Sequence, residues 1–267
     1  VGSEMCIRDR AMGDVDDRYI VEAVSYKRKV AKSRIIRRVI IAASIAAVFL
    51  IGVSIINMQR NTIPLSDRSH NVAVRYTSNP FIFFRHSGSL IGLTEEELFT
   101  KFDTVIFKGT IKEIKNIVVD FNGEKEYRAI AQIGVGKVYR GTCSEGDTVS
   151  VMLPCPISGW IHVTDTSTVS EMKAGVTGIF MPMVLDDESA LWMENGASLD
   201  KRDLADYDFV DGERYAFLET DSGLVFSRWA YASIADATTL DEVEEYIEKM
   251  LAVSYTHLRA HETRRHL

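Results

Sequence analysis

Four side chains that could do chemistry lie close together in LPCPISGWIHVTDT, residues 153–166: Cys155, Trp160, His162 and Asp165. One thiol and one imidazole are too few for a zinc site, which takes three or four protein ligands. A Cys–His nucleophile pair needs the base within hydrogen-bond reach of the thiol, and sequence spacing does not establish that distance. We interpret Trp160, His162 and Asp165 as candidate ligand-binding residues. Packing of Trp160 against a surface His162 is the structural alternative.

A second possible metal site lies in HLRAHETRRH, residues 257–266, where His257 and His261 are four residues apart and could share one helical face. However, VSYTHLRAHETRRHL at the end of the chain and VGSEMCIRDR at its start resemble translated sequencing-adaptor sequence. Fused segments of this kind are excluded from reasoning about a fold. We therefore assign residues 1–11 and 253–267 to adaptor sequence, with Met12 as the expected start. A native solvated tail and a metal site are the alternatives.

The remaining acidic motif, LADYDFVDGERY, places Asp206, Asp208 and Asp211 before Gly212. Its spacing departs from a calcium-binding loop and the later glutamate is missing, so turn and cap chemistry is the expectation. The chain contains no G-x-S-x-G, no H-E-x-x-H and no phosphate-binding glycine loop. We expect no catalytic residue, no metal and no cofactor, and hence a protein that is not an enzyme.

Charge is segregated along the chain. Residues 12–38 carry eight Lys and Arg against four Asp and Glu, whereas residues 57–252 carry 18 against 31. Phosphate binding needs clustered Lys and Arg, so an acidic main region argues against nucleic acid as a partner.

Between these regions, Val39 to Ile56 form eighteen uncharged residues with only Ser44 and Ser54 as polar members. As a helix this run spans about 27 Å, so residues 39–58 can cross the membrane core. The cations that precede it predict a cytoplasmic amino terminus and an extracytoplasmic remainder. A buried core helix and a cleaved signal peptide are the alternatives, and the length of the run favours a retained anchor.

The cytoplasmic segment, residues 12–38, has acidic residues in its opening turn and basic residues at its close, the order that a helix dipole favours. It is interpreted either as a solvated helix or tail, or as a docking peptide for a cytoplasmic protein. With the single anchor that follows, it resembles the starts of small single-pass bacterial membrane proteins, including anti-sigma-factor-like proteins.

Residues 59–92 lack a sustained period and contain Pro64 and Pro80, so we expect a tether there. Residues 93–252 are the expected domain, with helices opened by capping boxes at Thr94/Glu97 and Thr239/Glu242. The first strand is expected to have a bulge near residues 112–115, and FNGE to be a hairpin turn. Alternating apolar residues predict strands over 105–121, 127–135, 148–153, 175–185, 214–219 and 223–231.

Cys143 and Cys155 flank the predicted strand at 148–153, which would hold them roughly 20 Å apart. We therefore expect no disulfide between them.

Within residues 103–155, DTVIFKGTIKEI, IGVGKVYRG and GDTVSVMLP resemble the opening strands of an OB fold, and within it the netrin-like modules of metalloproteinase inhibitors. The inhibitory cysteine of those modules has no counterpart at the start of this domain. The expected fold is mainly β (α+β), a small antiparallel OB-like barrel with flanking helices, preceded by one transmembrane helix.

Together these features predict a non-enzymatic, membrane-anchored protein of the bacterial cell envelope that binds or senses an extracytoplasmic ligand or protein. The first alternative is an anti-sigma-factor-like regulator that binds a cytoplasmic partner through residues 12–38. A hydrolase that uses the 153–166 region is a second and weaker alternative.

Overall fold

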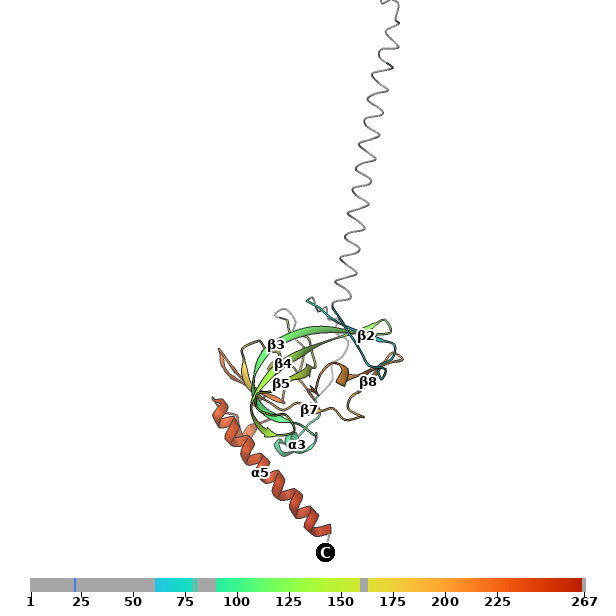
Figure 1. Ribbon diagram of the computed structural model, residues 1–267. Coiled ribbons are helices and arrows are strands. Elements are labelled where there is room, and N and C mark those ends of the chain that lie inside the picture. The colour runs from blue at the N-terminus through green and yellow to red at the C-terminus, as the bar shows by residue number, and fades with distance from the viewer. Residues whose placement is uncertain (1–21, 23–60, 79, 81–89, 159–162, 266–267) are drawn as a thin grey trace, which may run out of the picture. The chain divides into compact units, whose positions relative to one another are not determined.

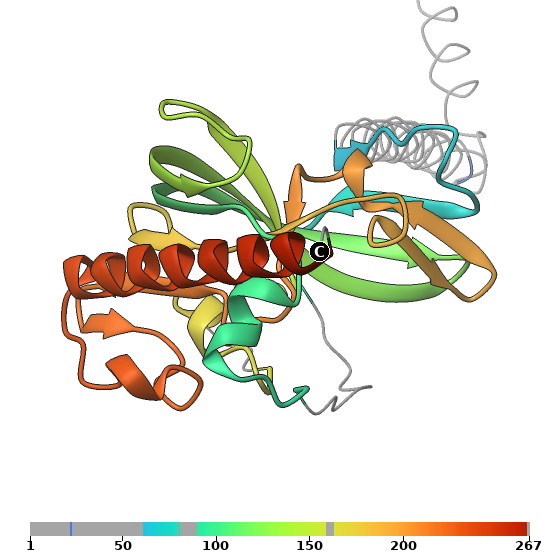
Figure 2. The ribbon, with the colours of Figure 1, turned by 90° about the horizontal axis from the view of Figure 1, so that it is seen from below.

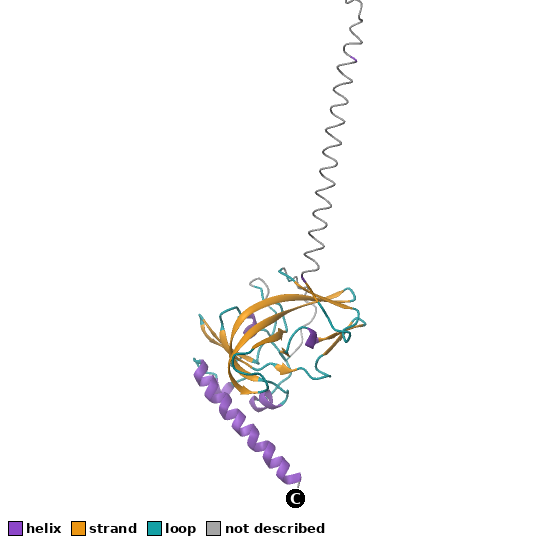
Figure 3. Cartoon of the chain, in the orientation of Figure 1, coloured by secondary structure: helices purple, strands orange, loops and turns teal. Residues whose placement is uncertain are grey.

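The computed structural model describes residue 22, residues 61–78 and 80, residues 90–158 and residues 163–265, with side chains described as far as residue 253. The chain divides into two units, 1–60 and 61–267, and nearly all described residues belong to the second. This second unit is mainly β, as expected, and its large sheet curls into a half-barrel (Figures 1 and 3).

Ten strands of the described residues form the large sheet, in the order β12-β11-β6-β3-β4-β5-β10-β7, with β2 pairing β3 and β1 pairing β2. Neighbouring strands are antiparallel except β5 and β10, which are parallel. Their bounds are β1 Thr62–Ile63, β2 Val72–Tyr76, β3 Ile106–Phe121, β4 Glu124–Arg140, β5 Thr148–Leu153, β6 Thr177–Phe180, β7 Met183–Val184, β10 Tyr207–Asp208, β11 Ala216–Thr220 and β12 Gly223–Val225.

The long hairpin of β3 and β4 forms the centre of the large sheet. Its pairing shifts register between Ile106 and Phe107, between Lys108 and Gly109, and between Ile111 and Glu113. The last shift confirms the bulge expected near residues 112–115. A close backbone approach accompanies the bend, because a Cβ on Gly109 would lie 2.6 Å from the carbonyl oxygen of Gly134. Glycine at this position lets the two strands curl together.

The bulge divides β3 between two hydrophobic cores. Before it, Phe107 and Ile111 pack into the main core inside the curled sheet. Beyond it, Ile117, Val119 and Phe121 pack into a second core, which is closed on its other side by a small two-stranded sheet, β8 (Leu191–Glu194) and β9 (Ala197–Asp200). The second core thus holds the β8–β9 hairpin against the outer half of the large sheet.

The described helices are α3 (Glu95–Thr100), α4 (Ser167–Ser170) and α5 (Leu240–Arg265), with short 3-10 turns η1 (Lys201–Asp203) and η2 (Ala232–Ile234). Both expected capping boxes are present, since Thr94 and Thr239 each exchange hydrogen bonds with the glutamate three residues later. Leu240, Val243 and Ile247 of α5 are buried in the main core, and Met250 packs against it. Figure 2 shows α5 passing beside α3, where Phe99 and Tyr246 meet edge to face at 5.9 Å.

The expectation of a tether over residues 59–92 needs correction for residues 62–76. Val72–Tyr76 pair with Ile117–Phe121 as β2, because the alternating Val72 and Val74 can pack on the second core while the intervening side chains stay exposed or half-buried. Residues 81–89 of the expected tether lie outside the described residues.

Among the helices of the described residues, none combines the length and the apolar character needed to cross a lipid bilayer. The predicted transmembrane segment, residues 39–58, lies outside the described residues, as does most of the predicted cytoplasmic segment, residues 12–38. At the other end, α5 continues through Arg265, beyond residue 252 where the domain was expected to close.

Candidate ligand-binding site

The sequence-predicted site is only partly described. Trp160 and His162 lie outside the described residues. Asp165 is half-buried in the turn before α4, with a left-handed φ of 58° that aspartate tolerates better than most residues. Burial raises the pKa of the Cys155 thiol, and the Thr166 hydroxyl opposes that effect only in part. A thiol kept protonated by burial is a poor nucleophile, so Cys155 is suited to packing.

The stretch that leads to these residues is held by a side chain of β3. The Asn116 amide nitrogen donates to the Ile157 carbonyl at 2.8 Å, and its oxygen accepts the Ile157 N–H at the same distance. This two-point bond replaces a strand pairing and fixes the course of the chain after β5. Cys143 and Cys155, on either side of β5, are both free thiols.

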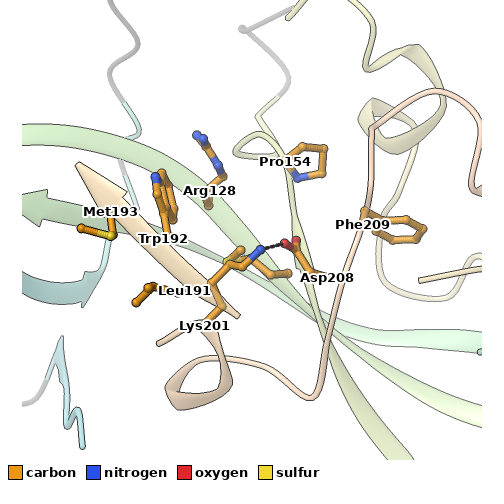
Figure 4. Close-up of a pocket in the computed structure, with 9 residues that line it drawn as sticks. Arg128, Pro154, Leu191, Trp192, Met193, Lys201, Asp208 and Phe209 are labelled. Atoms are coloured by element: carbon orange, nitrogen blue, oxygen red, sulfur yellow. Dashed lines mark hydrogen bonds and ion pairs between the residues drawn. The ribbon is translucent and has the colours of Figure 1, made fainter. Parts of the chain in front are cut away.

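A pocket of about 460 Å³ lies beside the start of that stretch, between the face of β4 and β5 and the β8–β9 hairpin (Figure 4). Such a volume falls within the usual range of small-molecule sites, about 300–1,000 Å³. Nine described residues line it: Arg128 from β4, Met152 and Pro154 from β5 and its exit, Leu191, Trp192 and Met193 from β8, and Lys201, Asp208 and Phe209 from the returning segment.

The hairpin that forms one wall turns at Asn195 and Gly196. Their φ values are 46° and 70°, and two positive values match the tight turn that Asn-Gly favours in hairpins. The Asn195 side-chain amide also donates to the carbonyls of Phe121 and Asn122, at 3.0 and 3.2 Å. These bonds attach the tip of the β8–β9 hairpin to the β3–β4 turn.

Trp192 is packed between two side chains of the large sheet. Its ring lies 4.8 Å from that of Phe121, and the Arg128 guanidinium lies 4.7 Å from its centroid. The Nη1 atom of Arg128 donates to Glu126 Oε2 at 3.0 Å and to the Tyr127 carbonyl at 2.8 Å. Stacking and hydrogen bonds together fix the orientation of Arg128 at the edge of the pocket.

An ion pair lies at the centre of the pocket. Lys201 Nζ donates to Asp208 Oδ2 at 2.5 Å, and the two side chains are only 13% and 11% exposed. Burial raises the pKa of the Asp208 carboxyl, against the opposing fields of Lys201 and Arg128. In Figure 4 the pair lies between Trp192 and Arg128 on one side and Pro154 and Phe209 on the other.

The three aspartates that suggested a failed calcium loop have separate structural roles. Asp206 accepts hydrogen bonds from the N–H and hydroxyl of Ser150, Asp208 pairs with Lys201, and Asp211 pairs with Arg214. The expectation of turn and cap chemistry is confirmed for Asp211, which accepts the N–H groups of Glu213 and Arg214. It is wrong for Asp206, which binds β5, and for Asp208, which forms an ion pair. Within the described part of the chain, no cluster of three or more His, Cys, Asp or Glu side chains is placed to hold a metal.

Sequence reasoning missed the residues that line the pocket. One local signal was available, because WMENGASL places Asn-Gly between short strand-like runs, which is typical of a hairpin. No comparable signal joins Arg128, Lys201 and Asp208, which belong to different segments.

The lining combines two cations, one carboxylate and several apolar side chains, a set that can hold a small molecule by charge and by shape. Comparison with protein-family models, with curated proteins and with solved structures found no match to this chain.

Proposed function

We propose that this chain is a non-enzymatic, membrane-anchored protein of the bacterial cell envelope that binds or senses a small molecule outside the cytoplasm. The observation that carries the binding role is the pocket between β4, β5 and the β8–β9 hairpin. The anchoring role rests on the uncharged run at residues 39–56 and on the cations before it.

An OB-like barrel is part of this proposal, and the strand connections support it. β3, β4 and β5 pair in turn, β5 pairs β10, β10 pairs β7, and a bridge between Met183 of β7 and Thr104 returns to the entry of β3. OB folds bind ligands on the face of their second and third strands and on two adjoining loops. The pocket is lined by residues of β4, β5 and the chain from β8 to Phe209, which supports an equivalent position for it in such a barrel.

Native mass spectrometry of the full chain purified from bacterial membranes tests the binding role. Wild-type protein is expected to retain a bound small molecule, and Arg128→Gln to reduce its occupancy because a lining donor is lost. Lys125→Gln removes an exposed cation from the same strand and is the control that leaves occupancy unchanged. Absence of any bound molecule, or equal occupancy in Arg128→Gln, contradicts the proposal.

A second candidate, an anti-sigma-factor-like transmembrane regulator, is favoured by contacts between the chain that follows the predicted anchor and residues next to the pocket. Ser66 and Ser69 donate to Asp203 Oδ2, at 3.0 and 2.7 Å. His70 and Ser198 exchange two backbone hydrogen bonds. Because Asp203 shares the η1 turn with the pocket residue Lys201, a change in the pocket can reach residues 66–70.

An immobilised peptide of residues 12–38 separates the two candidates. Incubated with cytoplasmic extract, it retains a defined partner if the chain is a transmembrane regulator. It retains nothing specific if the chain acts only outside the membrane. A peptide with the same composition in scrambled order is the control.

A further inference from the structure

Hydrogen-bond donors exceed acceptors around the pocket. A guanidinium carries five N–H groups and an ammonium three. The Nη1 atom of Arg128 is engaged by Glu126 and Tyr127, but no acceptor among the described residues engages its Nε or Nη2. Within the same part of the chain, Asp208 is the one acceptor that Lys201 reaches. A ligand that supplies oxygen acceptors therefore matches the free donors of the lining.

The pocket lining carries one more cation than carboxylate. Arg128, Lys201 and Asp208 give it a net charge of +1, with Lys201 paired to Asp208 and Arg128 paired to Glu126 of the same strand. The wider domain has the opposite bias, because residues 57–252 carry 31 acidic against 18 basic side chains. That field repels polyanions over a longer range, so a single oxyanion is favoured over a nucleic acid or another polyanion.

The rest of the lining is apolar and matches an apolar group on the ligand. Leu191 and Met193 of β8 are 48% and 71% exposed at the rim, while Met152 and Phe209 are buried. An apolar chain that covered the two rim residues would remove their surface from water, which favours binding. The cations and the apolar rim belong to one pocket, so one molecule can satisfy both.

We infer that the pocket binds an amphiphile with one oxyanion head, a carboxylate or a phosphate, and an apolar chain. The head accepts hydrogen bonds from Arg128 and Lys201, and the chain covers Leu191, Trp192 and Met193. This inference rests on the proposed binding function and names its ligand class.

Isothermal titration of the full chain in phosphatidylcholine nanodiscs tests the class, with empty discs as the blank. The probes are octanoate and octyl phosphate, which have both parts, octanol, which lacks the anion, and inorganic phosphate, which lacks the chain. Octanoate and octyl phosphate are expected to bind at least about tenfold more tightly than the other two, since each missing part removes about 1.4 kcal/mol or more. Equal affinity for octanol, or for inorganic phosphate, overturns the inference.

Variants locate the binding. Arg128→Gln is expected to weaken octanoate binding about tenfold, through the loss of a charge-assisted hydrogen bond, and to leave octanol binding unchanged. Lys125→Gln is expected to bind octanoate like wild type. Unchanged octanoate binding in Arg128→Gln places the anion elsewhere and overturns the inference.

The failure of this inference differs from that of the proposed function. If no probe binds while native mass spectrometry detects a neutral molecule that Arg128→Gln removes, the ligand class is wrong and the binding role stands. If no probe binds and no bound molecule is detected, both are wrong.

A further arm distinguishes a membrane lipid from a free solute as the source of the head group. Discs of phosphatidylglycerol replace those of phosphatidylcholine, and the octanoate titration is repeated. Weaker binding shows competition by the anionic lipid, whereas unchanged binding assigns the pocket to a free amphiphile. Either result supports the inferred chemistry, provided that octanoate binds in phosphatidylcholine discs.

Discussion

Replacing Asp211 with alanine is expected to lower the free energy of unfolding by roughly 3–5 kcal/mol, the usual cost of breaking a buried ion pair. Asp211 and Arg214 are only 8% and 3% exposed. Arg214 donates through Nε and Nη2 to Asp211 Oδ2, at 2.9 and 2.8 Å, and Asp211 Oδ1 accepts the N–H groups of Glu213 and Arg214. Without the carboxylate, a buried guanidinium and two N–H groups lose their acceptor.

The pair also positions the approach to α3, because Arg214 Nη1 donates to the Ile91 carbonyl at 2.7 Å. Urea unfolding followed by far-ultraviolet circular dichroism measures the loss. Asp221→Ala is the matched control, since Asp221 forms an exposed pair with Lys173 and its removal should leave the midpoint unchanged. The double variant Asp211→Leu with Arg214→Met should recover much of the loss. A loss below about 1 kcal/mol in Asp211→Ala contradicts the assignment of a buried pair.

Trp192→Ala is expected to have the second large effect on stability, because Trp192 belongs to the β8 wall of the pocket. The substitution removes the ring contact with Phe121 and the cation–π contact with Arg128, which together hold β8 on the sheet. Buried Trp to Ala changes cost about 3–5 kcal/mol, and Trp192 is only partly buried, so we expect about 2–3 kcal/mol.

Hydrogen exchange locates the effect of Trp192→Ala. Amides of β8 and β9 should lose protection more than those of β3 and β6 if the ring anchors the hairpin. Trp229→Ala is the matched control, because Trp229 is 61% exposed, and its loss is expected to change stability by about 0.5 kcal/mol or less. Equal effects of the two substitutions would show that Trp192 does not anchor the wall.

Local features of the fold could be predicted from the sequence because their causes are local. Thr94 and Glu97 form a capping box within four residues, and the β3–β4 hairpin and its bulge follow from a phase slip in one alternating run. The buried apolar stripe of α5 likewise follows from the spacing of the apolar residues within that helix. In each case neighbouring residues determine the outcome.

The pocket and the docking of β2 depend on contacts between distant segments, so the sequence did not predict them. β10 is two residues long and joins β5 in parallel, a pairing that places Asp208 in the site. Asp203 accepts a hydrogen bond from Ser66, which is more than a hundred residues away in the sequence. This contact brings the expected tether onto the domain. Residue alternation and helix capping are local patterns, so they do not predict contacts between segments that are distant in the sequence.

Labelling of Met193→Cys tests most directly whether the pocket faces the outside of the membrane. Met193 lies at the pocket rim and is 71% exposed, whereas the described native cysteines, Cys143 and Cys155, are half-buried and buried. In intact bacterial spheroplasts, a membrane-impermeant maleimide is predicted to label the variant to the same extent as after lysis, with wild-type protein as the background. Labelling that requires lysis would place the pocket in the cytoplasm and contradict the proposed function.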